Sequence, residues 1–279
     1  MSTPDQLTFI TNGTGKTGRR IAERLQSAGH PVRIGSRAGA PPFDWNDHAT
    51  WPATIDGVSA VYLAYHPDLA VPGAAETVAE LADLAVRAGA RRIVLLSGRG
   101  EEEAQRAEQL VRAADADVTV LRCAWFHQNF SESFFAEPVA AGELALPVGD
   151  DVREPFVDAD DIADTAAAAL TEDGHAGELY ELTGPRLMTF AHATHEIAAA
   201  TGRPVRFTSV PLGSFTAGLS AAQVPPGEQE LLAHLFGEVL DGRNATLSDG
   251  VQRALGREPR DFCTFARETA AAGAWPTPR

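Results

Sequence analysis

Residues 7–18 read LTFITNGTGKTG, and this stretch decides the fold. Its first five residues are apolar or β-branched, which is typical of a buried strand. Gly13, Gly15 and Gly18 follow at G-x-G-x-x-G spacing, and residues 19–29 repeat apolar side chains on one helical face. A strand, a glycine turn and a helix in this order indicate a dinucleotide site, because the backbone can approach a pyrophosphate at the helix N-terminus. An ordinary strand-to-helix turn is the alternative.

The expected cofactor contacts begin at this turn and continue at the end of the second strand, residues 31–34. An NAD site normally has an acidic residue there, which binds the ribose hydroxyls. Ser36 and Arg37 stand there instead, and a guanidinium and a hydroxyl suit a 2′-phosphate. The sequence therefore predicts NADP(H), although Arg37 as a solvated surface residue is the alternative. The turn residues expected to bind are Asn12, Gly13, Thr14, Gly15, Lys16, Thr17 and Gly18.

The composition narrows the class of protein. The chain has 279 residues, 44% of them hydrophobic, which suits one large α/β domain or a dinucleotide domain with a smaller lobe. A net charge of −15 argues against binding nucleic acid or an anionic membrane. Residues 1–6 are polar, so we expect no signal peptide, and two distant cysteines suit a reduced, cytoplasmic location. The sequence shows no metal-ligand spacing, and the oligomeric state is left open.

Strand and helix patterns alternate through roughly the first 170 residues. Apolar strands separated by helices predict an α/β fold with a doubly wound parallel sheet of the Rossmann type. We expect residues 1–152 to form this domain, residues 153–184 to return to the sheet, and 185–279 to form a smaller, mostly helical lobe of mixed character that covers the substrate. The expected strands are 7–11, 31–34, 43–45, 58–65, 91–97, 117–126, one near 153, 178–184 and 203–210.

The carboxyl ends of these strands supply the candidate site residues, because ligands of doubly wound sheets bind there. For the cofactor we expect contacts from Ala64, Ser97, Gly98, Ala124 and Trp125, and for the substrate from Tyr65, Arg99, Trp125, Phe126 and Asn129. Each has a plainer interpretation: Ser97 as a helix cap, Tyr65 as a loop residue, and the aromatic residues as core.

The familiar Tyr-x-x-x-Lys pair of short-chain reductases cannot form in this chain. Its only lysine is Lys16, and the helix expected at 101–114 contains no tyrosine. Three alternatives follow: the hydride acceptor needs little acid assistance, another residue donates the proton, or the protein binds the cofactor without reducing anything. Tyr65 and His127 are the remaining candidate donors near strand ends, and His127 facing solvent from a helix is the alternative.

The chain resembles the NmrA-like group of atypical short-chain dehydrogenases over almost its whole length. Its segment 91–111 followed by TVLRCAWFHQNFSE at 119–132 is similar to the group's pattern, with Glu108, Arg122, Phe126 and Asn129 at matching positions. Asn12 stands where the group has its first glycine, and asparagine tolerates left-handed backbone. GSR at 35–37 and FDW at 43–45 resemble the clavine-type dehydrogenases of ergot alkaloid pathways most closely.

This resemblance implies a reductase that transfers hydride from NADPH to a small, largely apolar acceptor. The relatives act on carbon–nitrogen double bonds or quinones, and an iminium would need no proton donor. In the superfamily, a serine at the position of Ser97 orients the substrate, so we expect its hydroxyl to point into the crevice. Other relatives sense the dinucleotide and bind a protein partner, so a regulator without turnover is the alternative.

Overall fold

The computed structural model describes residues 7–276, so the expectation drawn from residues 1–6 falls outside the described part. The chain separates into two compact units. The first contains the chain up to Cys123, Ala159–Leu182 and Asp249–Arg257, and the second contains Ala124–Asp158, Thr183–Ser248 and the chain from Glu258 onward. Each unit therefore combines segments that are distant in the sequence.

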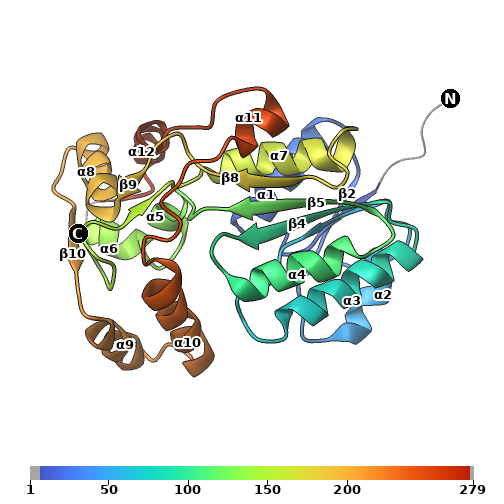
Figure 1. The fold of residues 1–279 in the computed structure, drawn as a ribbon, viewed down its shortest axis with the longest axis horizontal. Coiled ribbons are helices and arrows are strands. Elements are labelled where there is room, and N and C mark those ends of the chain that lie inside the picture. Colours follow the sequence, from blue (N-terminus) through green and yellow to red (C-terminus); the bar gives the residue numbers. More distant parts are fainter. Residues whose placement is uncertain (1–6, 277–279) are drawn as a thin grey trace. The chain divides into compact units, whose positions relative to one another are not determined.

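The first unit is built on a six-stranded sheet in the order β2-β1-β3-β4-β5-β8 (Figure 1). Every neighbouring pair of strands is parallel, which confirms the α/β, doubly wound prediction. The strand order reverses between β1 and β3, and ligands of such sheets bind beyond the carboxyl ends of the strands at this point. The strands are β1 (Thr8–Ile10), β2 (Val32–Ile34), β3 (Ala60–Leu63), β4 (Arg92–Gly98), β5 (Asp117–Cys123) and β8 (Leu179–Leu182).

Helices cover both faces of this sheet (Figure 1). α1 (Lys16–Ser27) packs beside α7 (Ala159–Thr171) on one face, and α3 (Ala74–Arg87) packs beside α4 (Glu102–Arg112) on the other. Three shorter helices complete the unit: η1 (His48–Thr50), α2 (Trp51–Ile55) against α3, and α11 (Gly250–Leu255) against α7 and β8.

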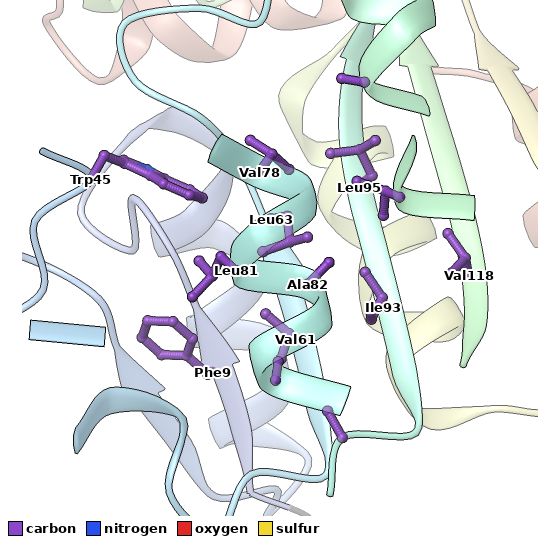
Figure 2. Packing of buried hydrophobic residues seen from close by; sticks show 14 of the residues in the cluster. Phe9, Trp45, Val61, Leu63, Val78, Leu81, Ala82, Ile93, Leu95 and Val118 are labelled. Carbon is purple, nitrogen blue, oxygen red and sulfur yellow. The ribbon is translucent and has the colours of Figure 1, made fainter. Parts of the chain in front are cut away.

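The core between the sheet and α3 shows how the strands are oriented (Figure 2). Alternate residues of a strand share a face, so Ile93 and Leu95 of β4 both point to this core, and Ser97 is next in the same row. Burying each large aliphatic side chain contributes about 1.5–3 kcal/mol. The labelled side chains from α3 and β3 are Val78, Leu81, Ala82, Val61 and Leu63.

The second unit combines two small sheets with helices around a phenylalanine-rich core. β6 (Glu143–Leu146) runs parallel to β10 (Arg206–Ser209), and β7 (Arg153–Glu154) runs antiparallel to β9 (Met188–Thr189). Four buried rings, those of Phe130, Phe156, Phe190 and Phe262, pack on one another. The helices are α5 (Asn129–Glu132), α6 (Ala136–Ala141), α8 (Phe190–Thr201), α9 (Leu212–Ala221), α10 (Pro226–His234), the π-helical turn η2 (Leu235–Val239) and α12 (Phe262–Ala271).

One expected strand does not form, and a second forms but joins a different sheet. Residues 43–45 form no strand in the described structure, and only an isolated bridge joins Asp44 to Asp47. Phe43 and Trp45 are buried with their ring centroids 5.1 Å apart, so this aromatic run fills the core from a loop. The strand expected near residue 153 is β7, which pairs with β9 in the second unit and does not join the main sheet.

The structure divides the chain differently from the boundary expected at residue 152. The chain leaves the main sheet after Cys123, so residues 124–152 belong to the second unit. Residues 249–257 return to the first unit through α11, where Gly250 lies so close to β8 that a Cβ would be 2.0 Å from the Glu181 carbonyl oxygen. The second unit also contains strands, since β6 and β10 pair within it.

Gly18→Ala tests the close contact between α1 and the glycine turn. A Cβ on Gly18 would lie 2.4 Å from the Asn12 carbonyl oxygen, so backbone must move. We expect the free energy of unfolding to fall by about 1–3 kcal/mol, as for other overpacked sites. The measurement is urea denaturation.

Gly218→Ala in α9 is the matched control. No heavy atom lies within 4 Å of its Cβ position, and alanine in a helix should raise stability by about 0.5–1 kcal/mol. Equal effects of the two substitutions would contradict the close contact.

Candidate active site

The glycine turn folds tightly because of Asn12. This residue has φ of 49°, in the left-handed region, which confirms that asparagine can replace glycine here. Its carbonyl oxygen accepts a hydrogen bond of 2.9 Å from the Gly15 N–H and lies against Gly18. A Cβ on Gly13 would lie 2.8 Å from the Ile34 side chain. The turn is therefore closed on the protein side by contacts that only glycine permits.

The start of α1 suits an anion. Gly15 occupies the N-cap position in an extended conformation, with no side-chain cap, and no acidic residue lies in the first turn. The first N–H groups of a helix have no partner within it, and the helix dipole is positive at this end. These features fit a pyrophosphate group at the turn.

The end of β2 is joined to the glycine turn through Gly35. The Gly35 N–H donates to the Ile10 carbonyl at 2.8 Å, and the Gly35 carbonyl accepts from the Gly13 N–H at 3.1 Å. Ser36 follows half-buried, and its carbonyl holds the next turn by accepting from Gly39 and Phe43.

Arg37 is exposed at this turn. Within residues 7–276 its guanidinium has no hydrogen bond or ion pair. A cation beside a hydroxyl, with no carboxylate at this position, fits a phosphate better than a ribose diol.

Thr11 ties the end of β1 to the end of β3. Its hydroxyl donates to the Tyr62 carbonyl at 3.0 Å and accepts from the Ala64 N–H at 2.7 Å. The Tyr62 hydroxyl donates to Thr17 of α1 at 3.0 Å, and burial raises the pKa of this phenol far above its usual range. Tyr62 therefore fixes α1 to the sheet and stays protonated.

Tyr65 lies beyond the end of β3, as the sequence predicted, but its ring packs on Trp45 with centroids 5.0 Å apart. It is half-buried.

The Ser97 side chain does not have the orientation expected for it. Its hydroxyl donates to Glu108 Oε1 of α4 at 2.6 Å, because the alternation of β4 directs residue 97 to the helix-covered face. Glu108 is 3% exposed and also accepts two hydrogen bonds from the Arg122 guanidinium, at 2.9 and 2.5 Å. Arg122 in turn donates to Glu181 at 3.1 Å. Ser97 thus belongs to a buried network that joins α4, β4, β5 and β8.

Arg99 extends this network beyond the strand ends. Its N–H donates to the Cys123 carbonyl at 3.1 Å, and its guanidinium lies 3.5 Å from Glu181 Oε2. The residue is 8% exposed, so its charge is held near β8.

A buried carboxyl pair at the ends of β3 and β4 was not predicted. Glu101 is 9% exposed and forms a hydrogen bond with the Asp68 side chain. Burial, followed by the charge of Asp68, raises the pKa of Glu101 to about 9. The two residues are 33 positions apart in the sequence, and no sequence motif connects them. The only signal in the sequence was that each follows a strand, and that these two strands are neighbours in the sheet.

The remaining predicted residues lie in the second unit. Trp125 is half-buried with its ring centroid 5.3 Å from that of Phe236, and Ala124 is buried. Phe126 forms a bridge with Val157, and Asn129 begins α5 with its carbonyl accepting from Ser133. These residues are separate from Tyr65, Ser97 and Arg99 in the division of the chain.

His127 is enclosed within the second unit and does not face solvent. It is 1% exposed, with Nε2 2.9 Å from the Phe156 carbonyl oxygen and Nδ1 3.5 Å from Asp158. Asp158 also accepts from Gln128 at 2.7 Å and from Arg260 at 3.0 Å. This environment favours a structural role over that of a proton donor.

Among the described side chains, no group of three or more His, Cys, Asp or Glu is arranged to hold a metal ion. None of the described helices combines the length and apolar character needed to cross a bilayer.

Comparisons with known proteins identify the family, although no family model matches the chain. The chain is 31% identical to the uncharacterized oxidoreductase YesF of Bacillus subtilis (strain 168), over 94% of this chain and 95% of that protein. It is 30% identical to agroclavine dehydrogenase of Claviceps fusiformis, over 93% and 96% of the two chains. The chain belongs to the NmrA-like family of short-chain dehydrogenases/reductases.

This NmrA-like reductase also shares its fold with the NADPH-dependent quinone oxidoreductase QOR2 of Escherichia coli. The TM-score is 0.77 at 21% identity, and the match covers 94% of this chain and 99% of that one. The resemblance to clavine-type dehydrogenases seen in the sequence is confirmed by the agroclavine dehydrogenase match.

Ser97→Ala tests the observed orientation of the serine hydroxyl. The substitution removes one donor from the buried Glu108 carboxylate, so we expect the free energy of unfolding to fall by about 1–3 kcal/mol. Ser214→Ala, at an exposed position of α9, should change it by less than about 0.5 kcal/mol. Chemical denaturation measures both, and an unchanged stability of Ser97→Ala would indicate a hydroxyl that does not bind Glu108.

Proposed function

We propose that this oxidoreductase uses NADPH to transfer hydride to a small, largely apolar acceptor. The observation that carries the proposal is the uncapped glycine turn beside an exposed Arg37 that has no carboxylate neighbour at the end of β2. Residues 12–18 would hold the pyrophosphate, and Ser36 and Arg37 would hold the 2′-phosphate. The bound cofactor would supply the hydride.

The strand ends would position the reacting groups. Ala64 and Gly98 follow or end neighbouring strands, and their backbones are suited to contact the nicotinamide half of the cofactor. Tyr65 and Arg99 lie just beyond the same ends and are proposed to face the acceptor. Ser97 would act through Glu108 by fixing α4, and not by direct contact with the acceptor.

Three acceptor classes are proposed: imines or iminium ions, quinones, and conjugated carbonyls. The similarity to agroclavine dehydrogenase and to a quinone oxidoreductase supports the first two. The chemistry of the chain also supports an iminium acceptor, since Lys16 is its only lysine and α4 contains no tyrosine. An iminium is already electrophilic and forms a neutral amine on reduction, so it needs no acid.

Arg37→Asp tests the cofactor preference. The substitution replaces a cation that would pair with the 2′-phosphate by an anion that repels it and accepts from ribose hydroxyls. We expect the Kd for NADPH to rise about 10–100-fold, the equivalent of a lost charge-assisted hydrogen bond, and NADH to bind more tightly than NADPH. Fluorescence titration with both cofactors measures the change.

Arg91→Asp provides the matched control. It makes the same charge change at an exposed residue that precedes β4, at the opposite end of the sheet. The ratio of its Kd values for NADPH and NADH should equal that of the wild type. If the wild type binds NADH as tightly as NADPH, the proposed cofactor preference is contradicted.

Turnover is tested by following NADPH absorbance with one acceptor from each class. Oxidation of NADPH by at least one class is expected. Tight NADPH binding without turnover on any class would instead support the second candidate, an NADP(H)-sensing regulatory protein. The absence of the Tyr/Lys pair supports this second candidate, because a sensor needs no proton donor.

A further inference from the structure

The carboxyl side chains of Asp68 and Glu101 form a pair in the first unit, beyond the ends of two neighbouring strands. Asp68 belongs to the loop after β3, and Glu101 follows the end of β4. Their side chains hydrogen-bond to each other. Two carboxylates have only acceptors, so such a bond requires a proton on one of them.

The Glu101 side chain is directed back to the strand end and away from its helix. Glu101 occupies the N-cap position of α4, yet its carboxyl makes no capping hydrogen bond. Instead it fills the space beside Gly98, where a Cβ would lie 2.3 Å from Oε1 and 2.5 Å from Oε2. Gly98 is thus needed for this placement, and it faces away from the helix-covered row that contains Ser97.

The charged groups around Glu101 favour its neutral form. Asp68 and Glu108 face it as acids, from the β3 loop and from α4. Cys123 at the end of β5 lies near both Glu101 and the Arg99 guanidinium, and burial raises the pKa of its thiol so that it stays neutral. Arg99 is the cation in this group, and it is directed toward Glu181.

We propose that Asp68 and Glu101 share one proton at the carboxyl ends of β3 and β4, and that Glu101 donates it to oxygen-centred acceptors during reduction. This inference rests on the proposed reductase function. It gives the chain an acid in place of the Tyr/Lys pair. It also separates the acceptor classes, because quinones and carbonyls would need this proton and iminium ions would not.

The step balances in atoms and charge. Hydride supplied by NADPH brings two electrons and one hydrogen to the acceptor carbon, and the electron pair of the C=O bond moves to oxygen. The Glu101 O–H bond breaks as its proton moves to that oxygen. The carboxylate left behind regains a proton from water through Asp68, which is only partly buried. With an iminium, the electron pair of the C=N bond moves to nitrogen, which becomes neutral, and no proton is consumed.

The shared proton is tested without cofactor, by infrared spectroscopy of the protein at pH 7. We expect a carbonyl stretch of a protonated carboxyl in the wild type, its loss in Glu101→Gln, and its retention in Glu102→Gln, an exposed neighbour outside the pair. The band should disappear with a midpoint near pH 9 in the wild type, since burial raises the pKa of Glu101 to about 9. In Asp68→Asn the midpoint should fall, because a negative neighbour is removed.

The donor role is tested by kcat with a quinone and an iminium acceptor. Glu101→Gln should reduce kcat for the quinone a hundredfold or more and leave kcat for the iminium within about tenfold. Glu102→Gln should change neither, and the Kd for NADPH should stay within a few-fold in every variant.

The outcomes distinguish the separate claims. A band that persists in Glu101→Gln contradicts the shared proton, whatever the activity. A lost band with unchanged quinone turnover contradicts the donor role alone. If wild-type protein binds NADPH but reduces no acceptor, the proposed function fails and the donor role with it, while the band still decides where the proton is held.

Discussion

The contact between the Asn12 carbonyl oxygen and Gly18 is the constraint on which the rest of the first unit depends. It holds the start of α1 against the end of β1, so that the helix begins directly beyond the strand. Two further links, Tyr62 to Thr17 and Gly35 to Gly13, attach β3 and β2 to the same point. The proposed phosphate site is therefore formed by backbone that the sheet itself holds in place.

A second set of interactions, centred on the Glu108 carboxylate, fixes the carboxyl ends of β4, β5 and β8. Glu108 receives hydrogen bonds from Ser97 and Arg122, and Arg122 reaches on to Glu181. A buried carboxylate with several donors is stable only while all of them remain, because an unmatched buried charge costs several kcal/mol. The ends of β4, β5 and β8 are consequently fixed to α4 as one group, which leaves Glu101 at a defined position before that helix.

The parts of the structure that the sequence predicted correctly depend on neighbours in the chain. The glycine turn and the left-handed Asn12 follow from local spacing and backbone preference. The orientation of Ser97 was available from the alternation of Ile93 and Leu95, but the position of the serine in the superfamily suggested the opposite face. The Asp68–Glu101 pair could not be predicted, because burial and a long-range contact create it. The strand expected at Phe43 and Trp45 was wrong for a similar reason. Aromatic residues that fill the core from a loop cannot be distinguished by composition from those of a strand.

The two units are built from alternating segments of the chain, and this limits how related proteins can diverge. The polypeptide passes between the units five times, after Cys123, Asp158, Leu182, Ser248 and Arg257. No single cut releases either unit, and a truncation anywhere between the first and last of these junctions removes residues from both. Exchanging the second unit by recombination would require five matched junctions. Divergence within such an architecture is therefore more accessible through point substitutions than through transfer of a whole unit.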